Sequence, residues 1–122
     1  MYRIFCLIVS MITHCAVLDA QTASFPDSTR SCPGCDLRRA RLFAAELVGA
    51  DLRGALLDSA DLRGALMHEA RLDSADLRGA FFKGADLRDA DIAEADWQNA
   101  VLTGAVWVDG RVCGGGSVGR CK

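Results

Sequence analysis

Residues 50–65 read ADLRGALLDSADLRGA and contain the five-residue phrase Ala-Asp-Leu-Arg-Gly twice, ten residues apart. Read outward from this stretch, fifteen consecutive units of five cover residues 35–109 without an insertion. Fourteen of these units begin with Ala, and ten carry Leu at the third position. An unbroken period of this kind indicates a repeat architecture, in which each unit packs on its neighbours.

The spacing of the repeat argues against a helix, although Ala, Leu and Arg favour one. Five residues turn a helix by about 500°, so the third-position residues would scatter around it instead of forming a stripe. Six units also end in Gly, which costs about 1 kcal/mol inside a helix. First and third positions do share a side in extended chain. The pattern therefore predicts short extended sides, corners at the fifth residue and a continuous apolar lumen.

Tandem units of the form Ala-(Asp/Asn)-Leu-x-Gly resemble the pentapeptide-repeat family over residues 35–109. The resemblance implies an all-β fold, a right-handed quadrilateral β-helix in which four units make one coil of twenty residues. First and third positions would point inward, and the other three would face outward or form the corner. Fifteen units correspond to about four coils, stacked at the parallel-strand spacing of roughly 4.8 Å.

The twenty-residue register predicts which inward residues stack. Leu52, Leu72 and Ile92 fall in one column, and extending the register places Cys32 below them and Val112 above. We therefore expect the β-helix over residues 30–109 and a C-terminal cap or tail over 110–122. Trp97 and Trp107 occupy the last inward positions, where we expect them to close the tube, with an aromatic ligand platform as the less favoured alternative.

The first twenty residues have the features of a secretory signal peptide. Arg3 precedes an apolar run from Ile4 to Ile12, and the small residue Ala20 stands before Gln21. We expect cleavage there, leaving residues 21–29 as a linker and the protein secreted or periplasmic without stable membrane insertion. A lipid-modified Cys15 and an uncleaved anchor are the alternatives; His14 disfavours the first, and a fifteen-residue apolar stretch is short for the second.

Four cysteines lie beyond the signal segment. Cys113 and Cys121 bracket the flexible stretch GGGSVGR, and in an oxidising compartment we expect them to form a disulfide that pins the tail. Cys32 and Cys35 have CxxC spacing. We expect a local disulfide there, with free buried thiols as the second interpretation and a redox or zinc site as the third.

The outward positions offer little chemistry. Oppositely charged residues fall in vertical columns, such as Arg38, Asp58 and Arg78, and we expect these to pair between coils. Glu69, Asp89 and Asp109 share another column, for which repulsion into water is favoured over binding of a cation. His68 is the only histidine beyond the signal segment, and no nucleophile or phosphate-loop motif occurs. We expect no enzyme activity, no metal and no cofactor.

Most outward residues are polar, but Phe81, Val101, Val106 and Val108 form an apolar corner near the C-terminal end. Such a patch is either covered or sticky. One interpretation is that residues 110–122 fold back over it. The other is that it binds a protein partner or a second copy, as the C-terminal ends of the resembling family often do.

These observations predict a non-catalytic, exported structural or protein-binding module. The resemblance adds an alternative, a DNA-mimicking protein that binds a type II topoisomerase. That role requires a long, acidic rod in the cytoplasm, whereas this chain is short, has a formal charge of −2 and carries an export-like segment. The nearly balanced charge also gives no reason to expect binding of nucleic acid.

Overall fold

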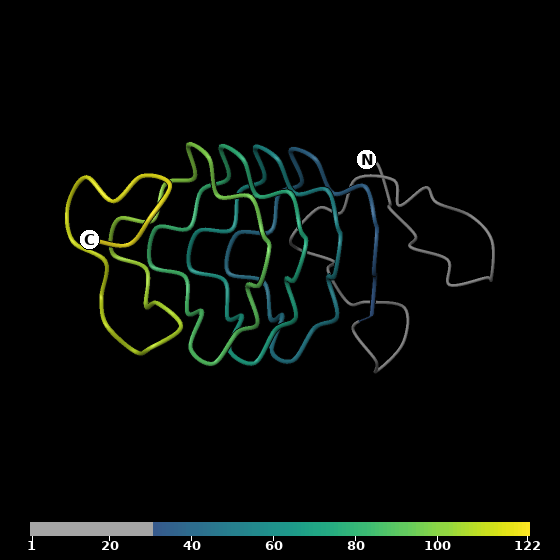
Figure 1. Cartoon of the computed structure of the whole chain (residues 1–122), viewed down its shortest axis with the longest axis horizontal. Helices are drawn as coiled ribbons and strands as arrows, with labels where there is room; N and C mark the ends of the chain where they lie inside the picture. Colours follow the sequence, from purple (N-terminus) through teal and green to yellow (C-terminus); the bar gives the residue numbers. More distant parts are fainter. Residues whose placement is uncertain (1–30) are drawn as a thin grey trace.

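A computed structural model describes residues 31–122, so the predicted signal peptide and linker lie outside the described part of the chain. Within residues 31–122, regular structure consists of single-residue β-bridges that alternate with two-residue turns. The coils stack along the long axis of the molecule, with the C-terminal residues at one end (Figure 1). The predicted repeat β-helix is thereby confirmed.

Successive coils are joined by twelve parallel bridges, each between residues twenty positions apart. The bridges form four columns, one for each side of the coil. The first side carries Asp36, Leu56, Asp76 and Asp96; the second Arg41, Asp61, Phe81 and Val101; the third Glu46, Leu66, Asp86 and Val106; the fourth Ser31, Asp51, Arg71 and Asp91.

The backbone of each side bonds both to the coil above and to the next corner. The amide of third-position Leu57 donates to the carbonyl of Asp76 at 2.7 Å, and the amide of Asp76 donates to the carbonyl of Ala55 at 2.9 Å. At the corner, the amide of Ala60 donates to the carbonyl of Leu57 at 3.0 Å. This i to i+3 bond closes a β-turn, so a unit of five residues satisfies its backbone groups by stacking.

The fifth position explains the glycines of the repeat. In fourteen of the fifteen units this residue has a positive φ, between 55° and 76°. Glycine enters this region at no steric cost, and other residues do so at about 1–2 kcal/mol. Six units use Gly, and eight hold another residue there, including Ser59, Glu69 and Asn99. A positive φ at the third turn residue is the pattern of a type II turn.

The lumen is filled by the first- and third-position side chains, as the register predicts. Ala makes room beside the larger third-position residue, and every third-position side chain from Leu37 to Leu87 is buried. Larger residues follow toward the C-terminal end. The rings of Phe82 and Trp97 lie 5.1 Å apart between centroids, and Trp97 meets Trp107 edge-on at the same distance.

The repeat register ends at Asp109, and the prediction that Val112 stacks inward above Ile92 is wrong. The positive φ moves to Gly110, and the amide of Trp107 donates to the carbonyl of Arg111, which reverses the chain. Val112 then pairs antiparallel with Val106 and is 65% exposed. The tail therefore lies edge-on along the last coil instead of starting another coil.

Candidate interaction surface at the C-terminal end

Outward aspartates pair within their own unit, and the expected vertical ladder of Arg38, Asp58 and Arg78 is not the main pattern. In each of the five Asp-Leu-Arg phrases the two charged side chains are two residues apart and share the outward face. The Arg63 guanidinium donates twice to the Asp61 carboxylate, at 2.7 and 2.6 Å. The Asp61 Oδ1 also accepts the backbone amide of Arg63 at 3.3 Å.

We call each such pair, in which one guanidinium donates two hydrogen bonds to the carboxylate two residues earlier, an Asp–Arg fork. The forks lower the carboxyl pKa values in the lower coils. Hydrogen bonds from the neighbouring guanidinium hold the pKa of the carboxyl below its ordinary value in four aspartates, despite partial desolvation. These are Asp51, Asp61, Asp76 and Asp86. Contacts between coils are longer, with Arg78 Nε 3.8 Å from Asp96 Oδ2 and Arg71 Nη1 4.0 Å from Asp51 Oδ2. In the five Asp-Leu-Arg units the outward charge is thus largely neutralised inside the unit.

The apolar corner predicted from the sequence spans two adjacent sides. Phe81 and Val101 are bridged neighbours on the second side, and Val106 lies on the third. Phe81 is 44% exposed, while Val101 and Val106 are half-buried. Val108 is also half-buried, but it packs against the core and contributes less to the outer surface.

The tail lengthens this corner instead of hiding it. Val118 pairs antiparallel with Val101, and Val112 with Val106, so each apolar column gains one further valine. Val118 remains 49% exposed and Val112 65% exposed. We call the resulting set the C-terminal apolar surface, and it comprises Phe81, Val101 and Val118 on the second side with Val106 and Val112 on the third.

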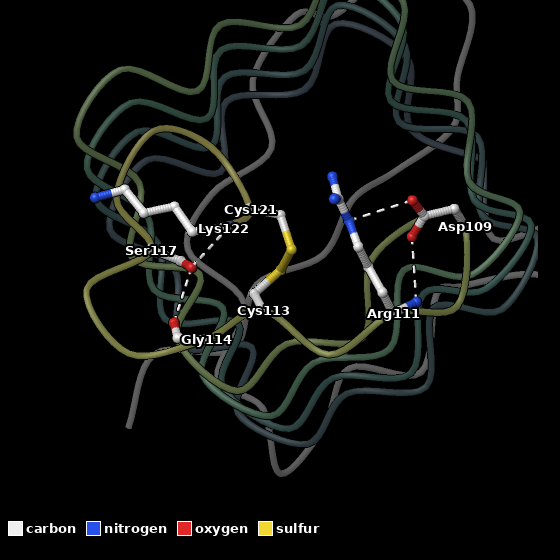
Figure 2. The surroundings of a disulfide bond; sticks show 7 residues. All are labelled: Asp109, Arg111, Cys113, Gly114, Ser117, Cys121 and Lys122. Carbon is white, nitrogen blue, oxygen red and sulfur yellow. Dashed lines mark hydrogen bonds and ion pairs between the residues drawn. A yellow bond between two sulfur atoms is a disulfide. The ribbon is translucent and has the colours of Figure 1, made fainter.

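The tail is fixed in this position by a disulfide and a buried serine (Figure 2). Cys113 and Cys121 are bonded, and Cys113 is buried against the core. The hydroxyl of Ser117 is fully buried, donates to the carbonyl of Gly114 at 2.8 Å and accepts the amide of Lys122 at 3.1 Å. The disulfide and these two hydrogen bonds therefore fix the backbone path of residues 110–122, although this segment lacks the five-residue period.

Val112 and Val118 were not predicted as part of this surface, because the extended register placed Val112 inward and assigned no position to Val118. Three other outward apolar residues, Phe43, Leu56 and Leu66, are also exposed. They are separated by charged neighbours along their columns, and the Arg63 guanidinium lies 5.7 Å above the Phe43 ring. Within residues 31–122, only the C-terminal apolar surface joins apolar residues of adjacent columns with no charged residue between them.

The remaining candidate groups lie apart from this surface. Cys32 and Cys35 are bonded to each other at the opposite end of the described chain. Within residues 31–122, no three His, Cys, Asp or Glu side chains are grouped closely enough to hold a metal ion, the column of Glu69, Asp89 and Asp109 included. The same residues include no helix that is long and apolar enough to cross a membrane.

Solved structures similar to this chain include several pentapeptide-repeat proteins. A protein from the thylakoid lumen of Arabidopsis thaliana is 29% identical with a TM-score of 0.53, and the match covers 63% of this chain and 57% of that one. HetL, a protein involved in heterocyst differentiation regulation in a Nostoc cyanobacterium, is 28% identical with a TM-score of 0.25, covering 67% and 55%. QnrB1, a plasmid-mediated fluoroquinolone resistance protein, is 19% identical with a TM-score of 0.34, covering 62% and 51%.

The match therefore spans little more than half the length of each of these solved proteins. A comparison with curated proteins finds no match. The family model described as Pentapeptide repeats matches eight copies, over residues 31–58, 45–84 and 82–106. These residues are the ones that form the stacked coils, and on this basis the chain belongs to the pentapeptide-repeat family.

Proposed function

We propose that this protein is an exported, non-catalytic binding module that presents the C-terminal apolar surface to a protein partner or to a second copy of itself. Pentapeptide-repeat proteins are in general non-enzymatic. The observation that carries the proposal is the contiguity of five apolar side chains over two sides of a rigid coil. A monomeric soluble protein rarely leaves such a patch without a use.

Export is supported by three observations of different kinds. The first twenty residues have the composition of a signal peptide. All four cysteines of the described chain are paired in disulfides, which persist in oxidising compartments. The Arabidopsis relative comes from the thylakoid lumen, a compartment outside the cytoplasm. The mature protein should begin at or near Gln21.

The charge distribution does not favour the alternative of DNA mimicry. Five outward aspartates are neutralised by an arginine two residues later, so the lower coils lack the continuous negative columns that would imitate a phosphate backbone. The whole chain carries a formal charge of only −2. Protein binding through an apolar surface therefore remains the proposed function.

The test of this function changes the two most exposed valines, Val112→Asp with Val118→Asp. In cells that export the protein, a photo-crosslinker placed at Phe81 should trap a partner or a second copy, and the double variant should lose that product. The matched control is Leu56→Asp, an exposed apolar residue on the first side, which should leave the product intact.

Thermal unfolding of each variant separates loss of binding from loss of folding. A folded double variant that still gives the crosslinked product would refute the proposed surface. Intact mass spectrometry of the same preparation checks export, because the mature chain should lack residues 1–20 and carry no free thiol. A full-length, fully reduced protein retained in the cytoplasm would refute the exported role.

A further inference from the structure

The last coil of the β-helix is paired on two sides and largely open on the other two, where Gly119 of the tail reaches only the corner at Asn99: a Cβ built on Gly119 would lie 3.8 Å from the Asn99 amide nitrogen. Val118 and Val112 of the tail cover the second and third sides through antiparallel bridges. The parallel columns of the fourth and first sides end at Asp91 and Asp96, and no residue of the described chain pairs above them. In Figure 2 the yellow C-terminal ribbon crosses only part of the coil outline.

Each side of a lower coil offers three backbone groups to the coil above. On the side that contains Leu57, the carbonyl of Ala55 accepts from the coil above at 2.9 Å, and the amides of Leu57 and Ser59 donate to it at 2.7 and 2.8 Å. Six equivalent groups of the last coil have no hydrogen bond to any residue of 31–122. They are the carbonyls of Ala90 and Ala95 and the amides of Ile92, Glu94, Trp97 and Asn99.

The inward side chains of this open edge are also incompletely covered. Leu72 and Leu77, one coil below, are fully buried, whereas Ile92, Ala95 and Trp97 are only half-buried. The Trp97 Nε1 is buried without an acceptor within the described chain. A missing layer would therefore supply both backbone partners and apolar cover, as each coil does for the one below.

Charge along the open edge is one-sided. Residues 90–98 contain three carboxylates, Asp91, Glu94 and Asp96, and no lysine or arginine, while Arg111 of the tail pairs with Asp109 at 3.2 Å. Asp91 and Asp96 each lack the arginine two residues later that forms the forks below, because Ala93 and Gln98 stand there. The Asp96 side chain is 55% exposed, and its one cationic neighbour is Arg78 at 3.8 Å. A segment that added a layer here would meet uncompensated negative charge.

We propose that the open edge, residues 90–98, binds an extended basic segment of another protein, which adds a parallel layer to the coil. Addition of a strand to an exposed edge is a general mode of peptide recognition, in which main-chain bonds give affinity and side chains give specificity. The edge lies at the end of the tube, on sides other than those of the C-terminal apolar surface. It is therefore a second binding surface, beyond the proposed function.

The coil geometry specifies the sequence that this edge accepts. The segment residue above Asp91 donates its amide to Ala90 and accepts from Ile92, so its own side chain faces outward beside the Asp91 carboxylate. The next residue points inward over Ile92. The same positions recur five residues later at Asp96 and Trp97. The recognised pattern is a lysine or arginine followed by an apolar residue, repeated after five residues.

A synthetic probe of this pattern is the acetylated and amidated peptide Ala-Lys-Leu-Ser-Gly-Ala-Lys-Leu, which ends above Trp97 and is titrated into the mature, oxidised protein by calorimetry. Asp91→Asn with Asp96→Asn should weaken binding by roughly tenfold. The asparagine oxygens still accept the amides that Asp91 and Asp96 bind now, at 3.1 and 3.0 Å, so these variants should keep the turns. Glu46→Gln with Asp58→Asn, in lower coils, should leave the affinity unchanged.

Backbone pairing is tested separately by amide hydrogen exchange. The amides of Ile92, Glu94 and Trp97 should exchange fast in the free protein and slowly with bound peptide. A peptide methylated on the backbone nitrogen of both lysines should bind more weakly, because it loses the donors to Ala90 and Ala95. No binding at millimolar peptide, equal binding of a glutamate-substituted peptide, or unprotected amides at saturation would each overturn the proposal.

Discussion

Because Gly64 occupies a left-handed fifth position, we predict that replacing it by alanine destabilises the protein, whereas a glycine-to-alanine change at an ordinary loop position stabilises it. Gly64 has φ 69°, and a Cβ built there meets no atom within 4 Å. Substitution by alanine therefore creates no steric contact with other residues, and its effect comes from the backbone alone. Gly115 is the matched control, since it has equally open surroundings but no positive φ.

The magnitude follows from two opposing terms. A non-glycine residue in the left-handed region costs about 1–2 kcal/mol, while glycine-to-alanine changes stabilise by about 0.4–1 kcal/mol through the unfolded chain. Gly64→Ala should therefore lower the free energy of unfolding by up to about 1.6 kcal/mol. Gly115→Ala should raise it by up to about 1 kcal/mol, because only the second term applies.

Urea unfolding followed by tryptophan fluorescence measures both changes, with an unchanged m-value as the check on two-state behaviour. The reverse substitution extends the test: Ser74 has φ 60°, so Ser74→Gly should be neutral or stabilising. If Gly64→Ala stabilised the protein as Gly115→Ala does, the assignment of a left-handed corner to Gly64 would be wrong.

Three further predictions use the same unfolding assay. Leu72→Ala leaves a cavity in the middle of the lumen and should cost about 3–5 kcal/mol, whereas Leu56→Ala, at an exposed position, should cost under about 1 kcal/mol; equal costs would contradict the register. Replacing Cys113 and Cys121 by serine opens a nine-residue ring and should cost about 2–3 kcal/mol, and an unchanged midpoint would mean that the tail needs no staple. The pKa of Asp61 is lowered by its arginine partner, so its stabilisation is complete above the ordinary carboxyl pKa and is lost as the pH falls through the lower folded value. The urea midpoint should drop in acid, and it should drop less in Asp61→Asn.

The sequence was sufficient to predict the coil because the repeat constrains the inward positions strongly. A buried third position must be large and apolar at every unit, and the first position must be small, so the alternation is visible without any structure. The buried column of Leu52 and Leu72, under the half-buried Ile92, follows directly from a step of twenty residues. The left-handed corner was visible only in part, because eight units hold a residue other than Gly there.

The outward charges were predicted less well, for a geometric reason. A step of twenty residues points to vertical partners such as Arg53 and Asp73. The turn at the fourth position brings Arg53 back over Asp51, two residues earlier, with a contact of 2.7 Å. The pair within one unit, Arg53 with Asp51, forms in preference to the pair between coils because it does not depend on the alignment of two coils. Its signal was present in the sequence as the recurrent Asp-Leu-Arg.

The path of the tail could not be read from the repeat, because nothing after Asp109 keeps the period. Chain reversal depends on Gly110 at φ 84° and on one hydrogen bond between Trp107 and Arg111, at 2.8 Å. One more unit in the same register, residues 110–114, would instead have placed Val112 in the lumen. Burial of Ser117 with two hydrogen bonds then decides which face of the tail turns inward.

In the Asp-Leu-Arg motif the aspartate and the arginine have separate roles, and the last coil keeps only the role of the aspartate. Aspartate at the second position turns the backbone by accepting the amide two residues later, and arginine at the fourth neutralises it. In the last coil Asp91 and Asp96 keep the first role, with contacts of 3.1 and 3.0 Å to Ala93 and Gln98, but the arginine is absent. The fold does not require that loss, since five lower units retain the arginine on the same geometry. Uncompensated charge therefore coincides, within residues 31–122, with an edge where backbone groups of the last coil lack partners, and this coincidence favours the proposed binding edge over a coil that simply ends.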